Sequence, residues 1–385
     1  MFQALFNSLS GLFSFSKSLD TVSNNISNMN TPGFRGSDSF FTNVNGGRGT
    51  QISGDGLRTA AGDIRQTGNA TDLAIDGNGY FILRDDNGAY FYTRAGQFRF
   101  GEDGLLKDTV TGYQVMAIDA AGNLREIDLD VYRTLPPQAT TIVSIAGNIA
   151  PGTLSFNAGS INVFDTTGAI HALSLSLADN SSVTPGSYIV TITDEAGVAI
   201  ATGEVRFGTD GTPLSGFNTL TINPTFKGVA QSIAIEFGSP GAYNGATTLA
   251  GTANNLGGRA KDGHALLGVT DISIDSKGVM QITYSSSEKR EGLQIAMATF
   301  QDESALQMIG GRLIDGQSSQ APDLGRPGEG VYGKIIGKSL ELANVDLTQE
   351  FADMIIIQRG YQASSRVMTV SNEMIEQLYN STRGG

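Results

Sequence analysis

Residues 347–379 read LTQEFADMIIIQRGYQASSRVMTVSNEMIEQLY. At about 100° per residue, the apolar side chains of this stretch fall on two nearly opposite faces of a helix. The first stripe comprises Leu347, Phe351, Met354, Ile357, Tyr361, Met368, Ile375 and Tyr379. The second comprises Ile356, Ala363, Val367, Val370, Met374 and Leu378. A helix that packs on one partner needs only one stripe, so the pattern predicts a helix contacted from both sides.

A polar residue interrupts the first stripe every seven positions, at Gln358, Ser365 and Asn372. This spacing disfavours a simple coiled-coil dimer, whose seam needs apolar residues at those positions. Two interpretations remain open from the residues alone. One is a helix buried in an ordinary globular core; the other is a helix packed among like helices in a tube.

The other end of the chain carries a second amphipathic helix. Its stripe comprises Phe2, Leu5, Leu9, Leu12, Leu19 and Ile26. Asparagine, proline and glycine within residues 24–34 predict that the helix ends and the chain turns there. Helices that bracket a chain in this way suit a subunit that polymerises through its joined ends. The predicted assembly residues are Leu5, Leu9, Leu12, Leu19, Ile26, Leu347, Phe351, Met354, Ile356, Ile357, Tyr361, Val367, Met368 and Met374.

Between the helices, short apolar runs alternate with glycine-containing turns, which predicts β-structure. The first β-block is interrupted by a second and is completed afterwards. The expected fold is mainly β with terminal α-helices, in which barrel- or sandwich-like β-domains are nested between an N- and C-terminal helical pair. The predicted divisions are an N-terminal helix (1–36), an extended linker (37–70), an inner β-domain (71–145 plus 251–312), an outer inserted β-domain (146–250), a return linker (313–338) and a C-terminal helix (339–385).

Composition argues against several classes of function. The 385 residues carry a net charge of −13 with only 25 Lys and Arg, which disfavours nucleic-acid binding. The chain has no cysteine and two histidines, so thiolate metal sites are excluded and catalytic groups are few. No apolar run reaches the roughly 18 residues of a membrane span, and no basic segment of a signal peptide precedes the first helix.

Candidate chemical motifs are weak. Asp76-Gly77-Asn78-Gly79 resembles the start of a calcium loop, but Tyr80 and Phe81 occupy the next two ligand-loop positions, so a β-turn is favoured. His171 lies in an alternating strand without a nucleophile elbow nearby in sequence. We therefore predict no catalytic residue, no metal site, no cofactor and no enzymatic activity.

Three motifs together resemble those of bacterial flagellar rod and hook proteins. The first spans residues 19–34 and contains Asn24, Asn25, Pro32, Gly33 and Phe34. The second spans residues 72–81 and contains Asp76, Gly77, Gly79 and Phe81. The third spans residues 344–363 and contains Asn344, Val345, Asp346, Gln358, Arg359 and Tyr361. Residues 163–177 and 275–300 are similar to the hook branch of this family, whereas rod members are typically shorter and lack a large second β-domain. The tail from Tyr379 to Gly385 runs slightly past the end expected for the family.

The resemblance implies a helical tube in which paired terminal helices line the channel and the β-domains lie outside. Such a hook is a curved, flexible joint that passes torque from rod to filament, and its subunit arms fold on assembly. The implied partners are copies of the chain itself, the distal rod protein, the hook cap protein, the hook–filament junction protein and the flagellar type III export apparatus. The implied location is extracellular, in the hook and basal body, after export without a cleaved signal peptide and without membrane insertion. The alternatives are a rigid distal rod protein and a secreted glycan-binding or hydrolytic β-protein. The lack of Trp and the scarcity of His disfavour the latter.

Overall fold

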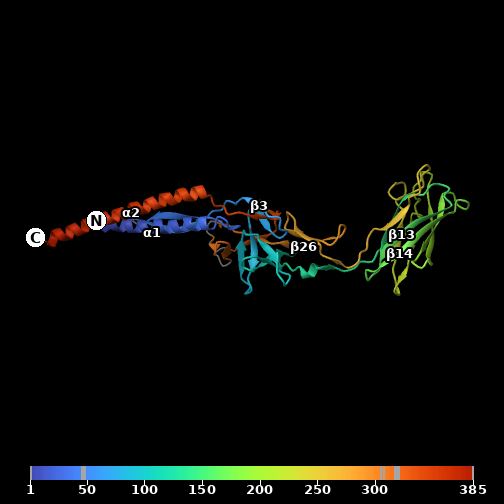
Figure 1. The fold of residues 1–385 in the computed structure, drawn as a ribbon, viewed down its shortest axis with the longest axis horizontal. Coiled ribbons are helices and arrows are strands. Elements are labelled where there is room, and N and C mark those ends of the chain that lie inside the picture. The colour runs from blue at the N-terminus through green and yellow to red at the C-terminus, as the bar shows by residue number, and fades with distance from the viewer. Residues whose placement is uncertain (1, 45–48, 304–305, 307, 316–320, 384–385) are drawn as a thin grey trace. The chain divides into compact units, whose positions relative to one another are not determined.

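The computed structural model describes residues 2–44, 49–303, 306, 308–315 and 321–383. The chain divides into two compact units (Figure 1). Unit 1 contains residues 1–132 and 270–385, and unit 2 contains residues 133–269. Unit 2 is therefore inserted into unit 1, and both ends of the chain belong to unit 1.

Two long helices lie side by side in unit 1, α1 (Phe2–Ser27) and α2 (Leu347–Arg383) (Figure 1). The turn after α1 begins where the amide of Asn28 still bonds to the carbonyl of Asn24, and the amide of Thr31 then bonds to that of Asn28. Asp346 caps the start of α2, because its Oδ1 accepts the Thr348 amide at 2.8 Å. Local hydrogen bonds thus set where α1 ends and where α2 begins.

Residues 37–70, which the sequence predicts to be a linker, contain strands. β1 (Ser37–Asn43) and β2 (Thr50–Leu57) form an antiparallel hairpin that packs along α1. β3 (Ile64–Gln66) pairs with β32 (Ser339–Glu341). β1, β2 and β3 are mostly exposed, and β1 and β2 are rich in Gly, Ser and Thr, so they carry no apolar alternation from which a strand could be predicted.

Residues 313–338, predicted to be a return linker, also contribute strands. They hold β29 (Leu313–Asp315), β30 (Asp323–Gly325) and β31 (Lys334–Gly337). β31 pairs with β4 (Leu73–Asp76). Each of these strands is three or four residues long within a Gly- and Pro-rich segment, which is too short for a recognisable period.

One large sheet forms the body of unit 1. Besides β29 and β30, its described strands are β5 (Tyr80–Arg84), β6 (Tyr90–Thr93), β7 (Phe98–Phe100), β8 (Leu106–Asp108), β9 (Gln114–Ile118), β10 (Leu124–Glu126), β24 (Asp271–Ile274), β25 (Val279–Thr283), β26 (Lys289–Ile295), β27 (Met297–Thr299) and β28 (Met308–Ile309). β9 pairs with β26, and β5 with β27, so strands from before and after the insertion share this sheet. A short 3-10 helix (Asp130–Tyr132) precedes unit 2.

Unit 2 consists of two main sheets that enclose one core. The four-stranded sheet contains β13 (Ser155–Phe164), β14 (Ile170–Asp179), β15 (Ser187–Thr193) and β16 (Ala199–Arg206). The other contains β12 (Ile142–Asn148), β17 (Thr219–Ile222), β20 (Ile233–Glu236), β21 (Ala246–Thr247) and β22 (Gly257–Ala260). Two-stranded pairs are β11 (Thr134–Leu135) with β23 (Leu267–Gly268), and β18 (Thr225–Phe226) with β19 (Val229–Ala230).

The ends of unit 2 lie outside the predicted range of 146–250. Val143 and Ile145 of β12 are fully buried in the same core as Leu175 and Val190 of the facing sheet. β12 pairs with both β20 and β22. The strand that contains Val143 and Ile145 therefore belongs to unit 2, although its residues read in sequence as the end of the preceding block.

Candidate functional site

Glycines let the two terminal helices approach each other closely, and most of the buried residues of α1 are small or polar. The buried residues of α1 are Ser8, Gly11, Ser14, Ser18, Val22 and Asn25. A β-carbon added at Gly11 would lie 2.9 Å from Ser364 Oγ in α2, and one added at Gly360 would lie 2.6 Å from Phe15 Cζ in α1. The helix axes can approach this closely only because these positions lack bulky side chains.

The apolar stripe predicted on α1 is a different face from the one buried against α2. Its assembly residues Leu5, Leu9, Leu12, Leu19 and Ile26 are all only half-buried. The most exposed large apolar side chains of the helix are Phe2 of this stripe and Phe6 and Phe13 beside it, at 70%, 61% and 69%. The single subunit thus covers this apolar face only in part.

The two stripes of α2 are covered unequally. In the first stripe Ile357 is buried, Leu347, Met354 and Met368 are half-buried, and Phe351 and Tyr361 are exposed. In the second stripe Ile356, Val367 and Met374 are all exposed, with Ile356 at 66%. Within the subunit, α1 therefore covers part of one stripe, and the opposite stripe remains open.

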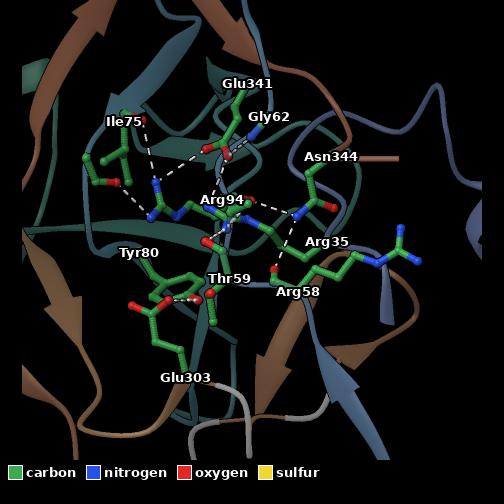
Figure 2. A network of polar contacts seen from close by, with 12 residues as sticks. Arg35, Arg58, Thr59, Gly62, Ile75, Tyr80, Arg94, Glu303, Glu341 and Asn344 are labelled. Atoms are coloured by element: carbon green, nitrogen blue, oxygen red, sulfur yellow. Dashed lines mark hydrogen bonds and ion pairs between the residues drawn. The ribbon is translucent and has the colours of Figure 1, made fainter. Parts of the chain in front are cut away.

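The three sequence motifs meet at a buried polar network, which we name the motif junction and define by Arg35, Arg94 and Glu341 (Figure 2). Arg35 Nη2 lies 3.1 Å from Glu341 Oε1, and Arg94 Nη1 lies 3.4 Å from Oε2. All three side chains are at most 3% exposed. The backbone amide of Gly62 also donates to Oε1 at 3.0 Å. Burial lowers the pKa of Arg94, and the charge of Glu341 opposes this effect.

The arginines of the motif junction also bind backbone carbonyls. Arg35 donates to the carbonyls of Thr59 and Ala60, the latter at 2.7 Å. Arg94 Nη2 donates to the Gly77 carbonyl at 2.9 Å (Figure 2). The two guanidinium groups therefore connect the segment after α1, the turn between β4 and β5, and β32 at a place that excludes water.

A second ionic contact fixes the first turn of α2. Glu350 is fully buried, and its carboxylate accepts Arg58 Nη1 at 2.6 Å and Asn25 Nδ2 at 3.2 Å. Arg58 also lies 2.7 Å from Asp38 Oδ1 in β1. Hydrogen bonding to Asp38 raises the pKa of Arg58 above its usual value, and Glu350 adds to this effect. The helix α2 is thereby tied to the end of α1 and to the hairpin.

Two motif asparagines replace missing backbone partners around these contacts. Asn344 Oδ1 accepts the Gly36 amide at 2.7 Å, and its Nδ2 donates to the carbonyls of Arg58 and Ala60 (Figure 2). Asn25 bonds to both the amide and the carbonyl of Ser37. The amide side chain supplies a donor and an acceptor at once, which explains asparagine at both positions.

The remaining motif residues are placed as follows. Asn24 Oδ1 accepts from Asn28, Pro32 is half-buried, the Gly33 amide donates to the Glu341 carbonyl at 2.8 Å, and Phe34 is 2% exposed. Asp76 pairs in register with Lys334, Gly79 lies in the following turn, and Phe81 is fully buried against Phe98. Val345 is half-buried, Asp346 caps α2, and Gln358 and Arg359 are exposed on α2.

Sequence reasoning missed the charged residues that join these motifs. Arg35, Arg58, Arg94, Glu341 and Glu350 were not among the predicted site residues. In a chain with only 16% charged residues, a charge directly after Gly33-Phe34 was an available signal for Arg35. The others lie at scattered positions, and only the pairing of distant strands brings them together.

The described part of the chain shows no group of three or more His, Asp or Glu residues arranged to hold a metal ion. Neither α1 nor α2, over the residues described, is long and apolar enough to cross a membrane.

Three segments of this chain match models of known protein families. Residues 5–35 match the family model for flagella basal body rod proteins, residues 74–155 match the flagellar hook protein FlgE/F/G D1 domain, and residues 337–381 match the flagellar basal body rod FlgEFG protein C-terminal region. Each of the segments that form the motif junction thus lies in or beside a matched region.

Relatives match over the whole length. The flagellar hook protein FlgE of Borreliella burgdorferi is 26% identical over 98% of this chain and 99% of its own. That of Escherichia coli is 28% identical over 98% and 99%, and that of Treponema pallidum 24% over all of both chains. The crystal structure of Helicobacter pylori flagellar hook protein FlgE2 shares the fold, with a TM-score of 0.50 at 15% identity over 72% of this chain and all of that one. Three matched segments in the same order and end-to-end similarity to hook proteins show that the chain belongs to the flagellar hook protein family.

Proposed function

We propose that this chain is the structural subunit of a flagellar hook that self-assembles into a curved, flexible tube and transmits torque from rod to filament. The observation that carries this proposal is the pair of uncovered apolar faces on α1 and α2. Glycines at the contact bring the helices close together, and several large apolar side chains remain outside, where Phe13 and Ile356 are 69% and 66% exposed.

Such a pair of helices is unfavourable in water by itself. Covering apolar surface stabilises an assembly by about 25 cal/mol per Å². Because exposed side chains lie on opposite faces of the pair, one neighbouring subunit cannot cover them all, whereas neighbours on several sides can. A tube of subunits with the helices inside satisfies this geometry, and copies of the same chain are the natural neighbours.

The further partners and the route follow from this role. We propose contacts with the distal rod protein, the hook cap protein and the hook–filament junction protein, and export through the flagellar type III apparatus without a cleaved signal peptide. The proposed location is the extracellular hook, continuous with the basal body. A purely structural role without enzymatic activity is supported by the relatives, which are named as hook proteins. The net charge of −13 speaks against a nucleic-acid partner.

The experiment is electron microscopy of the purified full chain after concentration with salt. Curved tubes support the hook, straight tubes support a distal rod protein, and the absence of any tube overturns the assembly proposal. Val367→Asp, on the exposed stripe of α2, should prevent tube formation, whereas Gln362→Asp, an exposed position between the two stripes, should not. Normal tubes from Val367→Asp would show that the second stripe is not an assembly face.

Unit 2 offers a separate test of the hook against the rod. Its low charge and many small residues suggest that neighbouring copies slide across shallow contacts, which would permit bending. Because β11 and β23 pair at its base, residues 134–268 can be removed and the ends joined over a short distance. A hook that lacks unit 2 should lose its curvature or its normal bending stiffness, and an unchanged hook would contradict this role.

A further inference from the structure

Five Asp-x-x-Gly-x turns in the described part of the chain have the same backbone hydrogen bonds, at Asp85, Asp119, Asp165, Asp194 and Asp275, and three of them share a further contact. Asp119, Asp165 and Asp275 each begin an Asp-x-x-Gly-x turn. In every case Oδ1 accepts the amides of the second and fourth following residues at 2.8 to 2.9 Å. This leaves Oδ2 of each aspartate free to accept a bond from elsewhere.

The sixth following residue supplies that bond in all three hairpins. The donors are Arg125 Nε at 3.2 Å, His171 Nε2 at 3.1 Å and Gln281 Nε2 at 3.4 Å. Arginine is always charged at this position and glutamine never is. Histidine changes its charge between about pH 5 and 8. We call each pair of such an aspartate and its sixth following residue a clamp. One of the three clamps, Asp165–His171, therefore has a titratable donor.

The hairpin of His171 also holds a further element. The ring of Phe226, in the β18–β19 hairpin, stacks on the His171 imidazole with 4.1 Å between ring centroids and 11° between planes. Lys227 Nζ lies 4.0 Å from Asp165 Oδ2 and 3.5 Å from Thr167 Oγ1. The β18–β19 hairpin thus packs on the Asp165–His171 pair.

The charged groups around His171 are predominantly acidic. A cavity of about 350 Å³ beside the ring is lined by Asp194 and Glu195 from the β15–β16 turn and by Lys227. Asp165 bonds to the ring, so the charged residues beside His171 are three acidic ones and one lysine. Glu195 is held in place because its Oε1 accepts the Ala172 amide at 2.9 Å. A proton added to the ring enters a net negative environment.

We propose that Asp165, His171, Phe226 and Lys227 form a pH-dependent clamp that holds the β18–β19 hairpin on the four-stranded sheet of unit 2. Protonation converts a neutral hydrogen bond to Asp165 into a charge-assisted one, and it places a cation against the Phe226 ring. The clamp is tighter at about pH 5.5 than at pH 8, because the imidazolium is lost as the pH rises. This device would make the mechanics of unit 2 depend on external pH, whatever the chain assembles into.

The carboxylate partner remains charged throughout that range. The Thr167 hydroxyl, followed by His171 and the backbone amides of the turn, holds the pKa of Asp165 far below its usual value. Asp165 therefore stays charged between pH 5.5 and pH 8, and histidine is the side-chain type in the clamp whose ordinary titration range lies there.

The test is backbone hydrogen exchange of residues 225–231 in the full chain, compared among variants at the same pH. His171→Gln copies the neutral clamp of Gln281, and His171→Arg copies the charged clamp of Arg125, so both keep a donor in place. The wild type should match His171→Arg at pH 5.5 and His171→Gln at pH 8, with protection changing by about three- to tenfold relative to the Gln variant.

His264→Gln is the control for the other histidine of the chain, because the His264 ring bonds to the carbonyl of the next residue at 2.8 Å and not to Asp165. Its pH response in residues 225–231 should equal that of the wild type. The proposal is overturned if the wild type and His171→Gln keep the same ratio of protection at both pH values, or if His264→Gln abolishes the change.

Discussion

Gly360 of α2 lies against the ring of Phe15 in α1, so closely that a β-carbon there would come within 2.6 Å of Cζ. One helical turn away from this contact, Gly11 of α1 lies similarly close to Ser364 of α2. The helical pair is therefore held within the subunit by close approach of small residues. Its larger apolar side chains are left for surfaces outside the pair.

A disulfide can test this pairing. The position of a β-carbon at Gly11 is 3.6 Å from Ser364 Cβ, which lies in the range of about 3.5–4.5 Å found in disulfides. Because the chain has no cysteine, Gly11→Cys with Ser364→Cys should give one intramolecular bond under oxidising conditions, seen as a mobility shift that reductant reverses. Gly11→Cys with Val367→Cys places the second thiol on the exposed face and should not cross-link within the subunit. A bond only between subunits would contradict the pair as described.

One conservative substitution in the motif junction should cause a large loss of stability. Glu341→Gln removes the only carboxylate bonded to both Arg35 and Arg94 in the described network. Two buried guanidinium groups are then left without a counter-charge, which should lower the free energy of unfolding of unit 1 by about 3–5 kcal/mol. Hydrogen exchange of the buried strands β5 and β9 in the full chain measures this loss.

The exposed pair Arg84–Glu126 provides the control for that experiment. Its side chains are 38% and 39% exposed at a separation of 2.9 Å. Glu126→Gln should cost less than about 1 kcal/mol, because solvent already screens the pair. Equal effects of the two substitutions would show that the motif junction is no more than a surface ion pair.

The terminal helices illustrate what the sequence reveals and what it conceals. Apolar periodicity correctly predicts α1 and α2, but its stripe on α1 marks a face that the single subunit covers only in part. The residues of α1 that are buried in the subunit are mostly Ser8, Gly11, Ser14 and Ser18, which give no hydrophobic signal. Periodicity reports which side chains avoid water, whereas close packing of a pair of helices depends on which side chains are small.

The candidate site shows the same limit. Asn25, Gly33 and Asn344 were identified through motif resemblance, and the structure gives each of them a backbone partner. The charges that link the motifs could not be predicted, because Arg35 and Glu341 are separated by 306 positions and meet only after β3 pairs with β32. Short strands without alternation made that pairing invisible in the sequence.

Unit 2 should lose stability in acid. The Thr167 hydroxyl lowers the pKa of Asp165, Arg206 lowers that of Glu204, and the Thr212 amide lowers that of Asp210. A carboxylate whose pKa is depressed by folding contributes stability above its unfolded pKa, and this contribution disappears as the pH falls through the folded value.

With unfolded values near 3.8 for Asp and 4.5 for Glu, the loss should begin as the pH falls below about 4.5. Denaturant unfolding of the full chain at pH 5, 4 and 3, followed by hydrogen exchange in the core strands β14 and β15, measures it. Glu204→Gln should make the decline shallower, since one depressed carboxylate is removed. A free energy of unfolding that stays constant from pH 5 to pH 3 would refute the role of these carboxylates.

Gly33 should be irreplaceable because a side chain there would clash with neighbouring backbone, in addition to the strain from its positive φ. Its φ is +72°, and a β-carbon would lie 2.2 Å from the Ala95 amide nitrogen. Gly68 has a similar φ of +84°, yet its β-carbon position has nothing within 4 Å. Gly33→Ala and Gly68→Ala therefore share the strain of a left-handed conformation, about 1–2 kcal/mol, and only Gly33→Ala must also displace neighbouring backbone.

That displacement would break the bond from the Gly33 amide to the Glu341 carbonyl and so loosen the motif junction from which α2 extends. We expect Gly33→Ala to lower the free energy of unfolding of unit 1 by about 3 kcal/mol or more, and Gly68→Ala to stay within the cost of strain. Hydrogen exchange in β5 and β9 compares the two variants in the full chain. Equal losses would mean that the segment after α1 can shift away from Ala95, and that Gly33 is needed only for its φ.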